Sequence, residues 1–520
     1  MKTDQKPSGV DSSSQKEPMA YEDFRKRLHP HNCKSFSYSS FYKEIESIYG
    51  AMDDDNKFFL SCIAMLSENE VVKRRLLTNW WVGEDKLKTS NSEKKTPEEL
   101  VDEILDSFRA KGLIEPAEKL GKERVKNYRM HPLVRFAVNR LSESKFFAFN
   151  NNGILTANIS KSNRACIIKY PYQEPEYWKN TEKIATVFNV SEPFPDLNLQ
   201  QLTKKKDSIL GGEWISKIRN VKVLYLGRWS KSPDYHIEVE SFELLKGWKN
   251  MKELRLLSLQ GISNINKLPS SIGRLKNLII IDVKECHNLE ALPKDVSCLN
   301  NLTYLDVSNC HILDRMPKGI SSLKKLQVFK GFVITAEPSN NLGALDDLKE
   351  LTELRKLSII ANSNHFPTII DLGTLLQFGK LRILAIAWES KQGSHGTKGL
   401  TRTGETIHPS LLPEKPALLP ENLEKLSLQG FPKPKMPSWL VETSKYKCLK
   451  KLCIRGGMLK TLGNEPLRSV QTLYLKFLSD LKTDWKELQE RFPSMVHLKT
   501  VKCPRVTFCP CDEYGYCYLV

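Results

Sequence analysis

The chain repeats one apolar pattern every 24 residues between residues 254 and 331. The first three copies read L-x-x-L-x-L, with Ile or Val replacing some leucines, and a Leu-Pro or Met-Pro pair follows each of them. The alternation at the end of the motif predicts a short strand, because successive strand side chains point to opposite faces. One copy cannot bury its apolar face alone, so the copies must stack into a solenoid. The copies begin at Leu254, Leu278, Leu302 and Leu326.

This pattern is that of a leucine-rich repeat, whose parallel strands line a concave surface. It recurs less regularly on both sides, so that about eleven units occupy roughly residues 215–505. We predict a long polar loop at 390–420, which contains glycines and prolines but no strand motif. The expected fold is α/β, with a leucine-rich-repeat domain at 215–510, a connecting or capping segment at 146–214 and a tail at 511–520. Further strand motifs are centred on Leu224, Leu357, Leu384, Leu426, Leu452, Leu473 and Leu498.

The positions that flank the second leucine of each motif should point out of the concave face, because that leucine points inward. They mix aromatic, apolar and charged residues, which suits a protein partner with a few dominant contacts. A nucleic-acid site would instead show a run of Arg and Lys. The expected exposed set is Leu256, Ser258, Ile280, Asp282, Tyr304, Asp306, Ile383, Ala385, Lys425 and Ser427, with Arg255 and Arg382 at the rim. The ligand-binding candidates are Tyr304, Asp282, Asp306, Arg255, Arg382 and Lys425.

The composition predicts a cytoplasmic protein without a membrane span. No run of eighteen apolar residues is present, and the start, MKTDQKP, lacks the hydrophobic region of a secretory signal. We therefore interpret Cys286 and Cys310, which occupy equivalent positions in adjacent repeats, as packing residues and not as a disulfide. The net charge of +18 favours acidic partners but does not choose among protein, nucleic acid and anionic lipid.

The first part of the chain is organised differently. Residues 1–36 lack periodicity, and we predict disorder there. Thr96-Pro97-Glu98-Glu99 is a capping box that predicts a helix at 97–111. Two earlier helices at 58–63 and 73–81, two strands of a hairpin at 113–114 and 124–130, and a last helix from Pro132 complete the pattern. Together these elements predict a winged-helix domain at 37–145.

The run FFLSCIAMLSENEVVKRRLLTNWWVGE at 58–84 and Met130-His131-Pro132 resemble the winged-helix part of plant disease-resistance receptors of the nucleotide-binding, leucine-rich-repeat type, coiled-coil class. The repeats at 419–440 and the closing Cys503-Pro504-Arg505 also look like that family's repeats. The resemblance covers about residues 40–510. It implies recognition of a pathogen effector or a host protein by the solenoid, and it leaves open an action on a full-length receptor.

The sequence departs from the family in ways that affect nucleotide binding. It contains no G-x-x-x-x-G-K-[ST] motif, so the parts that cradle phosphates and hold magnesium are missing. The family's M-H-D reads Met130-His131-Pro132. The resemblance associates this histidine with bound ADP, and His131 is therefore a weak cofactor candidate. We expect it instead to cap or pack the start of the last helix, and we predict no cofactor.

No active site follows from the sequence. No signature of a catalytic nucleophile is present, and Cys503, Cys509, Cys511 and Cys517 lack the paired C-x2-C spacing of a zinc site. We therefore expect a binding protein and not an enzyme, with no metal. Two alternatives stay open: a nucleotide-binding immune switch whose P-loop region is missing from the gene model, and a winged-helix nucleic-acid-binding protein. The second would use the basic helix around Arg74 and Arg75, but Trp80 and Trp81 suit an intramolecular packing role.

Overall fold

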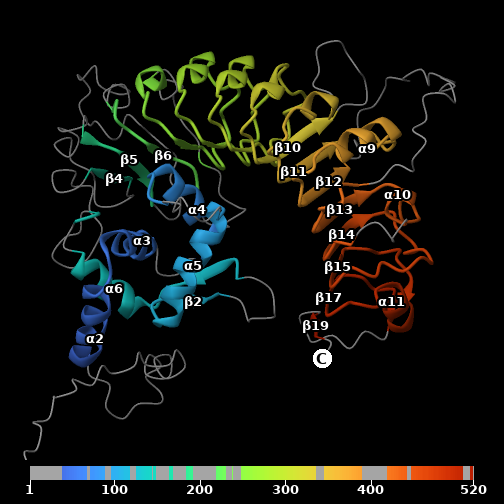
Figure 1. Ribbon diagram of the computed structural model, residues 1–520, viewed down its shortest axis with the longest axis horizontal. Helices are drawn as coiled ribbons and strands as arrows, with labels where there is room; N and C mark the ends of the chain where they lie inside the picture. The colour runs from blue at the N-terminus through green and yellow to red at the C-terminus, as the bar shows by residue number, and fades with distance from the viewer. Residues whose placement is uncertain are drawn as a thin grey trace, which may run out of the picture. The chain divides into compact units, whose positions relative to one another are not determined.

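The structure is a computed structural model in which two compact units can be distinguished. The first unit comprises Met1–Trp81 and Lys86–Leu155, and the second comprises Val82–Asp85 and Thr156–Val520. Figure 1 labels the helices and strands of both units. The structure describes residues 38–66, 71–87, 95–117, 125–142, 145–147, 163–167, 183–190, 218–229, 237, 247–334, 345–388, 419–441, 447–507 and 516–518. The disorder predicted for residues 1–36 lies outside these ranges.

The described residues of the first unit form mainly five helices, and the last two residues of α4 belong to the second unit. The predicted capping box is confirmed. The Thr96 hydroxyl accepts a hydrogen bond from the Glu99 N–H (3.3 Å), and the Glu99 carboxylate accepts one from the Thr96 N–H (2.8 Å). The helices are α2 (Tyr38–Gly50), α3 (Asp54–Ala64), α4 (Arg74–Gly83), α5 (Pro97–Ala110) and α6 (Pro132–Leu141).

A three-stranded antiparallel sheet of order β1-β3-β2 completes the first unit. Strands β2 (Glu115–Pro116) and β3 (Asn127–Arg129) confirm the predicted hairpin, although β2 begins two residues after the expected start at Leu113. Leu113 is instead buried ahead of the strand. The sequence analysis missed strand β1 (Val72–Lys73), because a two-residue strand that leads directly into a helix has no periodic signal of its own.

Two tryptophans of α4 form the centre of this unit's core. Trp80 and Trp81 are fully buried, and Trp81 packs against Phe59 with ring centroids 4.3 Å apart. On the same helix, Arg74 forms an ion pair with Asp102 of α5 at 2.7 Å. The tryptophans of this basic helix therefore pack in the core, and Arg74 forms an internal ion pair. Both observations disfavour the alternative in which this helix binds nucleic acid.

The second unit contains one 14-stranded sheet in which thirteen strands run parallel and follow the order of the chain. This is the leucine-rich-repeat solenoid that the periodicity predicts. The last strand, β19, pairs antiparallel with β17 and ends the sheet. The strands are β4 (Arg164–Ile167), β5 (Thr186–Asn189), β6 (Val223–Tyr225), β7 (Leu256–Ser258), β8 (Ile280–Asp282), β9 (Tyr304–Asp306), β10 (Val328–Ile334), β11 (Lys356–Ala361), β12 (Ile383–Trp388), β13 (Lys425–Phe431), β14 (Lys451–Gly457), β15 (Thr472–Lys476), β17 (His497–Val501) and β19 (Tyr516–Tyr518).

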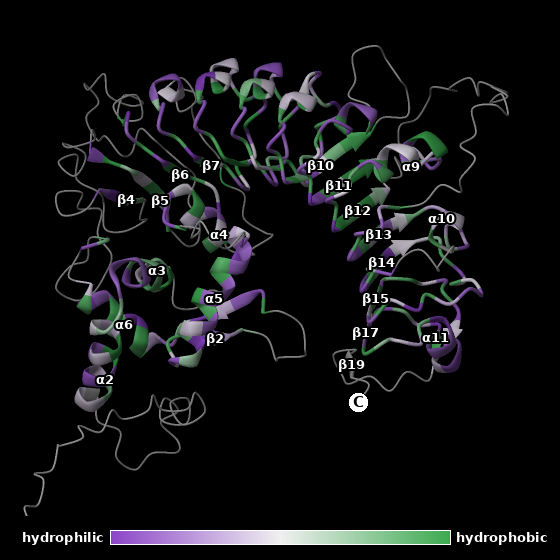
Figure 2. Ribbon diagram, in the orientation of Figure 1, coloured by the Kyte–Doolittle hydropathy of each residue, from purple (hydrophilic) through white to green (hydrophobic). Residues whose placement is uncertain are grey.

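The second leucine of every motif lies in one continuous row across the sheet. Leu257 pairs with Ile281, Ile281 with Leu305, and Leu305 with Phe329, and the row continues in register to Leu498. All members of the row from Leu257 to Leu498 are at most 1% exposed. Figure 2 shows the resulting mixture of hydrophobic and hydrophilic residues along the strands. This burial by stacked neighbours is what makes a repeat dependent on the units beside it.

Short helices lie on the other side of the core from the strands (Figure 1). In the regular repeats, a proline occupies the cap position immediately before the 3-10 helices η5 (Ser270–Arg274) and η6 (Lys294–Cys298). Proline suits this position because its fixed φ is compatible with the start of a helical turn. A backbone N–H at a helix start makes no hydrogen bond within the helix, so the N–H that proline lacks is not needed there. Farther along the chain, α9 (Ile369–Leu376), α10 (Ser438–Val441) and α11 (Trp485–Arg491) replace the 3-10 turns.

The sheet extends beyond the predicted bounds 215–510 at both ends. The segment 146–214, predicted to connect or cap, contributes β4 and β5, which pair parallel with each other, and β5 also pairs with β6. They were missed because their inward positions carry Ala165 and Val187 in place of leucine. The tail at 511–520 contains β19. Most of the predicted loop at 390–420 lies outside the described residues.

Cys286 and Cys310 pack as predicted. Both are buried free thiols, and each Sγ donates to the backbone carbonyl of a preceding repeat at 3.2 Å. Burial in apolar surroundings raises the pKa of the Cys310 thiol to about 12. These groups therefore stay protonated and fill the turn of their repeats.

Candidate functional site

The outward side chains of the strands form the surface on which the ligand-binding candidates were predicted, and we call it the strand face. In each strand of the regular repeats, two outward residues flank the buried second leucine. Because the strands are parallel and in register, equivalent residues lie side by side, such as Ser258, Asp282, Asp306 and Lys330. The strand face therefore consists of rows that run across the repeats.

The predicted exposure of this face is wrong for β7, β8 and β9. Their outward residues are all buried, from completely for Asp306 to 8% exposed for Tyr304. Each of these strands has only three residues. A period of two shows which side of the sheet a residue occupies, but not whether that side is covered. The buried residues are Leu256, Ser258, Ile280, Asp282, Tyr304 and Asp306.

Tyr304 and Asp306 are held by Lys330 from the next strand. The Tyr304 hydroxyl donates to Asp306 Oδ2 at 2.9 Å, and Lys330 Nζ lies 2.9 Å from the same oxygen and 2.7 Å from the hydroxyl. The Lys330 ammonium also lies 4.8 Å from the centre of the Tyr304 ring. The other carboxylate oxygen, Oδ1, accepts the Ser308 N–H at 3.1 Å. These contacts give Tyr304 and Asp306 a structural role in place of the predicted ligand contact.

The segment Val82–Asp85 of the second unit covers part of the strand face at its N-terminal end. A Cβ placed on Gly83 would lie 2.8 Å from Leu256 Cβ, so the glycine backbone packs directly on this outward leucine. The ligand candidate Arg255 forms an ion pair with Asp85 at 2.7 Å. The adjacent Glu84 is nearly buried and forms an ion pair with Arg164 at 2.8 Å. Arg255 is therefore engaged by the protein's own chain.

A second ion-pair cluster joins the turn that follows β6 to the turn that follows β8, two repeats farther along the chain. Glu285 forms ion pairs with Lys284, at 2.6 Å, and with Arg228. Burial raises the pKa of the Glu285 carboxyl, but the hydrogen bonds and positive charges of Lys284 and Arg228 outweigh this effect and lower it to about 2. The carboxylate is therefore charged at neutral pH and stabilises these turns.

The strand face is accessible from β11 onward. Outward positions such as Ile383 and Ala385 of β12 and Lys425 and Ser427 of β13 are half-buried, as are the outward residues of β14 and β15 with few exceptions. Arg382 is exposed, with its Nε 3.7 Å from a carboxylate oxygen of Glu424. Among the six ligand candidates, Arg382 and Lys425 are therefore the two whose side chains are at least partly exposed on the strand face from β11 onward.

Several accessible residues were missed as candidates, although the sequence contained a signal for them. Lysine immediately precedes the second leucine in β11, β13 and β14. In the structure, Lys451 and Lys476 lie 4.0 Å and 5.1 Å from the centre of the Tyr474 ring. Arg455 lies 5.2 Å from the ring of Phe477, which is 43% exposed. The C-terminal part of the strand face therefore combines positive charge with aromatic rings.

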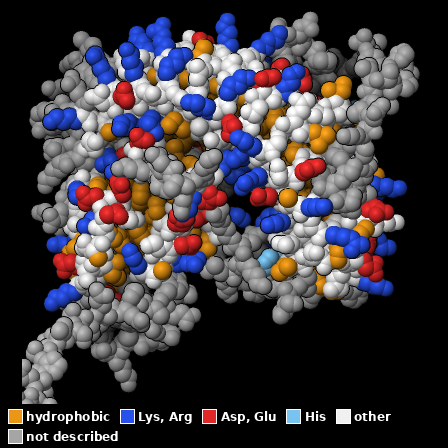
Figure 3. All heavy atoms as spheres, in the orientation of Figure 1, with side chains coloured by type: hydrophobic (Ala, Val, Ile, Leu, Met, Phe, Trp, Pro, Cys, Tyr) orange, Lys and Arg blue, Asp and Glu red, His pale blue; other side chains and the backbone are white. Residues whose placement is uncertain are grey.

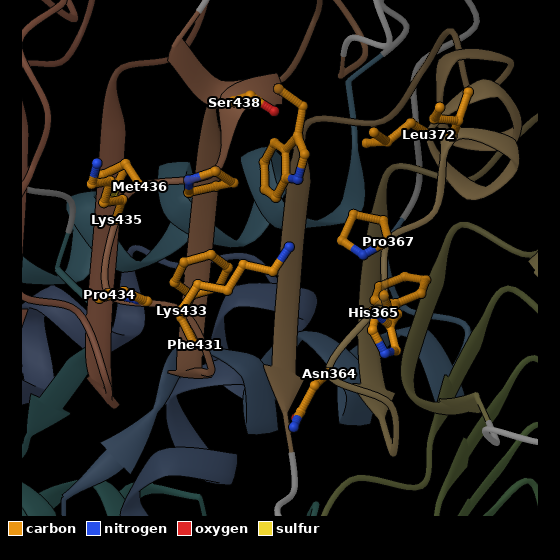
Figure 4. Close-up of a pocket in the computed structure, with 14 residues that line it drawn as sticks. Asn364, His365, Pro367, Leu372, Phe431, Lys433, Pro434, Lys435, Met436 and Ser438 are labelled. Atoms are coloured by element: carbon orange, nitrogen blue, oxygen red, sulfur yellow. The ribbon is translucent and has the colours of Figure 1, made fainter. Parts of the chain in front are cut away.

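A pocket of about 480 Å³ lies between the segment that follows β11 and the segment that follows β13. Its walls are mainly apolar and aromatic, and Figure 4 shows the side chain of Lys433 pointing into the space between the two segments. None of the six ligand candidates lines it. The lining residues include Phe366, Pro367, Leu372, Phe431, Met436 and Trp439.

His131 occupies the cap position that the sequence analysis expected. Its Nδ1 accepts a hydrogen bond from the Leu133 N–H at 3.2 Å, and Pro132 takes the first position of α6. This ring nitrogen therefore satisfies one of the backbone donors that a helix start leaves without an intrahelical partner.

Within the described part of the chain, no three His, Cys, Asp or Glu side chains are grouped so that they could hold a metal ion. Of the C-terminal cysteines, Cys503 donates to the Val501 carbonyl, while Cys509 and Cys511 lie outside the described residues. None of the described helices combines the length and the hydrophobicity that a membrane span requires.

The parallel sheet, its buried leucine row and the helices behind it define a leucine-rich-repeat solenoid. A family model described as a leucine-rich repeat region matches residues 204–511, and the chain belongs to this family. Among curated proteins, the chain is similar to disease resistance RPP13-like protein 4 of Arabidopsis thaliana, with 27% identity over 484 residues. That match covers 91% of this chain and 52% of the relative, so the chain spans about half the relative's length. The resemblance to plant disease-resistance proteins is thereby confirmed.

Two solved structures match part of this chain at low sequence identity. An internalin from Listeria monocytogenes matches with 13% identity and a TM-score of 0.37, covering 66% of this chain and 82% of the internalin. The leucine-rich-repeat ectodomain of the Arabidopsis receptor kinase HAESA, solved with a peptide hormone ligand, matches with 12% identity and a TM-score of 0.35. This second match covers 65% of this chain and 52% of the receptor chain.

Proposed function

We propose that this chain is a plant disease-resistance-like protein that takes part in defence by recognising another protein through its strand face. The partner is a pathogen effector, a host protein that an effector modifies, or a full-length receptor of the same type. The observation that carries the proposal is the accessible strand face from β11 to β17, on a chain similar over 91% of its length to a disease resistance protein. Large rigid surfaces of stacked repeats are suited to binding proteins.

We propose further that the recognition occurs without a nucleotide switch in these 520 residues. Phosphate binding at a P-loop needs a cradle of backbone N–H groups and a lysine, and the sequence lacks that motif. His131 occupies the position that the family resemblance associates with bound ADP. Its Nδ1 accepts a hydrogen bond from a backbone N–H at the start of α6. Calorimetry of the purified protein with ADP and magnesium should show no saturable binding. Tight binding with a stoichiometry near one would refute this part of the proposal.

We also propose that residues 37–145 are a winged-helix domain with a structural role. Its helices and its antiparallel sheet of order β1-β3-β2 support this assignment. The buried Trp80 and Trp81 and the ion pair of Arg74 with Asp102 favour packing over nucleic-acid binding. The composition of this basic helix is thus explained by internal contacts.

Affinity capture from plant cells tests the recognition proposal. The wild-type chain is compared with a variant that carries Arg382→Glu and Lys425→Glu on the strand face. The control variant carries Lys294→Glu and Lys318→Glu, two exposed lysines on the helical side of the repeats that change the net charge by the same amount. A partner protein that is retained by the control and lost by the strand-face variant supports the proposal. Equal retention by both variants would move the site away from this face.

A further inference from the structure

The outward side chains of β13, β14, β15 and β17 form a basic patch on the strand face. They include five cationic residues and no Asp or Glu, in contrast to the two aspartates in the outward rows of β8 and β9. We call these five residues the basic row. They are Lys425, Lys451, Arg455, Lys476 and Lys499.

The register of the sheet places four residues of the basic row in two pairs. Lys425 pairs with Lys451, and Arg455 pairs with Lys476, so these residues lie at equivalent positions of neighbouring strands. Lys499 lies between the two pairs in register, beside Tyr474. Adjacent strands are only about 4.8 Å apart, so an anionic group bound across two strands can approach a cation on each. The arrangement therefore favours a ligand that carries several negative charges at short spacing.

Two aromatic rings lie among these cations. Tyr474 is half-buried and has the Lys451 and Lys476 ammonium groups 4.0 Å and 5.1 Å from its ring centre. Phe477 is 43% exposed, with Arg455 at 5.2 Å and Lys502 at 5.7 Å from its ring centre. An exposed phenylalanine surrounded by cations suits a ligand that adds an apolar side chain to its negative charges.

Two acidic residues of the same repeats have contacts with residues outside the basic row. Glu424 precedes the outward positions of β13 and is 3.7 Å from Arg382, and Asp484 caps α11 by accepting the Glu487 N–H. Figure 3 shows that, over the visible face as a whole, Lys and Arg side chains are interspersed with Asp and Glu. The outward positions of the four strands differ from this general mixture.

We propose that the basic row binds an acidic, extended segment of a protein partner, with Phe477 contacting an apolar side chain of that segment. This inference rests on the proposed function and names the chemistry of its partner. Four strands span about 14 Å between the first and the last, which matches four to five residues of an extended peptide. Asp and Glu along such a peptide meet cations on successive strands, and the association is salt-sensitive because the patch is solvent-exposed.

The aromatic contacts favour an acidic peptide over a nucleic acid. Single-stranded nucleic acids bind by stacking bases on aromatic faces. The ring of Tyr474 already has two ammonium groups close to it, which compete with a stacked base for space at the ring. A carboxylate can instead approach the same ammonium groups without displacing them from the ring.

The test measures binding of defined probes to the full chain. The first probe is a fluorescent eight-residue peptide of Glu and Asp with one central Phe, the second is the same peptide with Gln and Asn, and the third is single-stranded DNA of equal charge. We expect the acidic peptide to bind, with affinity falling at higher salt. The variant with Lys451→Glu and Lys476→Glu should lose at least tenfold in affinity, a change of about 1.4 kcal/mol. The variant with Lys294→Glu and Lys318→Glu should bind like the wild type.

Several results would overturn the inference. They are equal binding of the acidic and the neutral peptide, tighter binding of DNA than of the acidic peptide, and equal affinity of the two charge-reversal variants. Thermal melts of both variants show whether the fold is intact. If it is not, Lys451→Gln and Lys476→Gln serve as the milder substitution with the same expected direction. A cellular partner that is retained by the wild type and by the Lys451→Glu, Lys476→Glu variant, but lost by an Arg382→Glu variant, would refute the inference about the basic row and leave the proposed function standing, because Arg382 does not belong to that row.

Discussion

The contacts of Asp306 allow a quantitative prediction about the strand face. The Asp306 side chain is completely buried, and its carboxylate accepts hydrogen bonds from Ser308 N–H, from the Tyr304 hydroxyl and from Lys330. Lys330 itself keeps about a fifth of its side chain exposed. The substitution Asp306→Ala removes the buried charge and leaves the ammonium group without its carboxylate partner.

The expected cost follows from the burial of the pair. Removal of one partner of a buried ion pair costs about 3 to 5 kcal/mol, because the other charge remains desolvated. The ammonium of Lys330 keeps some water, so we expect about 3 kcal/mol for Asp306→Ala, at the lower end of this range. Lys330→Met should cost about 2 kcal/mol, since the carboxylate retains two hydrogen-bond donors. Tyr304→Phe, which removes one hydroxyl, should cost about 1 kcal/mol.

A double-mutant cycle with urea unfolding measures these values. The double variant Asp306→Ala, Lys330→Met should be less destabilised than the sum of the single variants by about 2 kcal/mol, because each single substitution already breaks the same contact. The slopes of the unfolding curves must agree among the variants for this comparison to hold. Additive effects would show that the contact between Lys330 and Asp306 contributes no stability, and the structural role assigned to Asp306 would then be wrong.

Three further substitutions test other parts of the structure. Leu305→Ala, at a fully buried inward position, should cost about 2 to 5 kcal/mol in thermal or urea unfolding, and similar stability to that of the exposed control Lys318→Ala would contradict the strand register. Glu285 has a lowered pKa of about 2, so the contribution of its charged carboxylate to the free energy of unfolding is complete above about pH 4.5. This contribution is lost as the pH falls toward 2. The stability difference between wild type and Glu285→Gln should therefore shrink from at most about 3 kcal/mol as the pH is lowered, and a constant difference would refute the ion pairs as its source. Gly83→Ala places a Cβ 2.8 Å from Leu256 Cβ and should cost about 1 to 3 kcal/mol, whereas unchanged stability would show that this packing is loose.

The sequence alone was sufficient to predict the repeats, the row of inward residues and several helices and turns. Repeats of an apolar motif with a 24-residue period bury their apolar residues by stacking, so the sequence predicts a solenoid. The inward positions such as Leu257 follow from the alternation of strand side chains. The helix start at Thr96 was also predictable, since a capping box is satisfied entirely by residues three positions apart. These features depend on interactions within a unit or between a unit and its neighbour.

The extent of the sheet and the accessibility of the strand face were decided by the tertiary structure. Strands β4 and β5 lack the leucine motif and join the sheet because β6 offers β5 an edge to pair with, and β5 in turn offers one to β4. Tyr304 and Asp306 have the sequence positions of ligand contacts, yet Lys330 from the next strand satisfies both. Gly83 and Asp85, far away in sequence, lie against Leu256 and Arg255. Periodicity shows which side of the strand a residue occupies, but only contacts between distant segments determine whether that side is open to a partner.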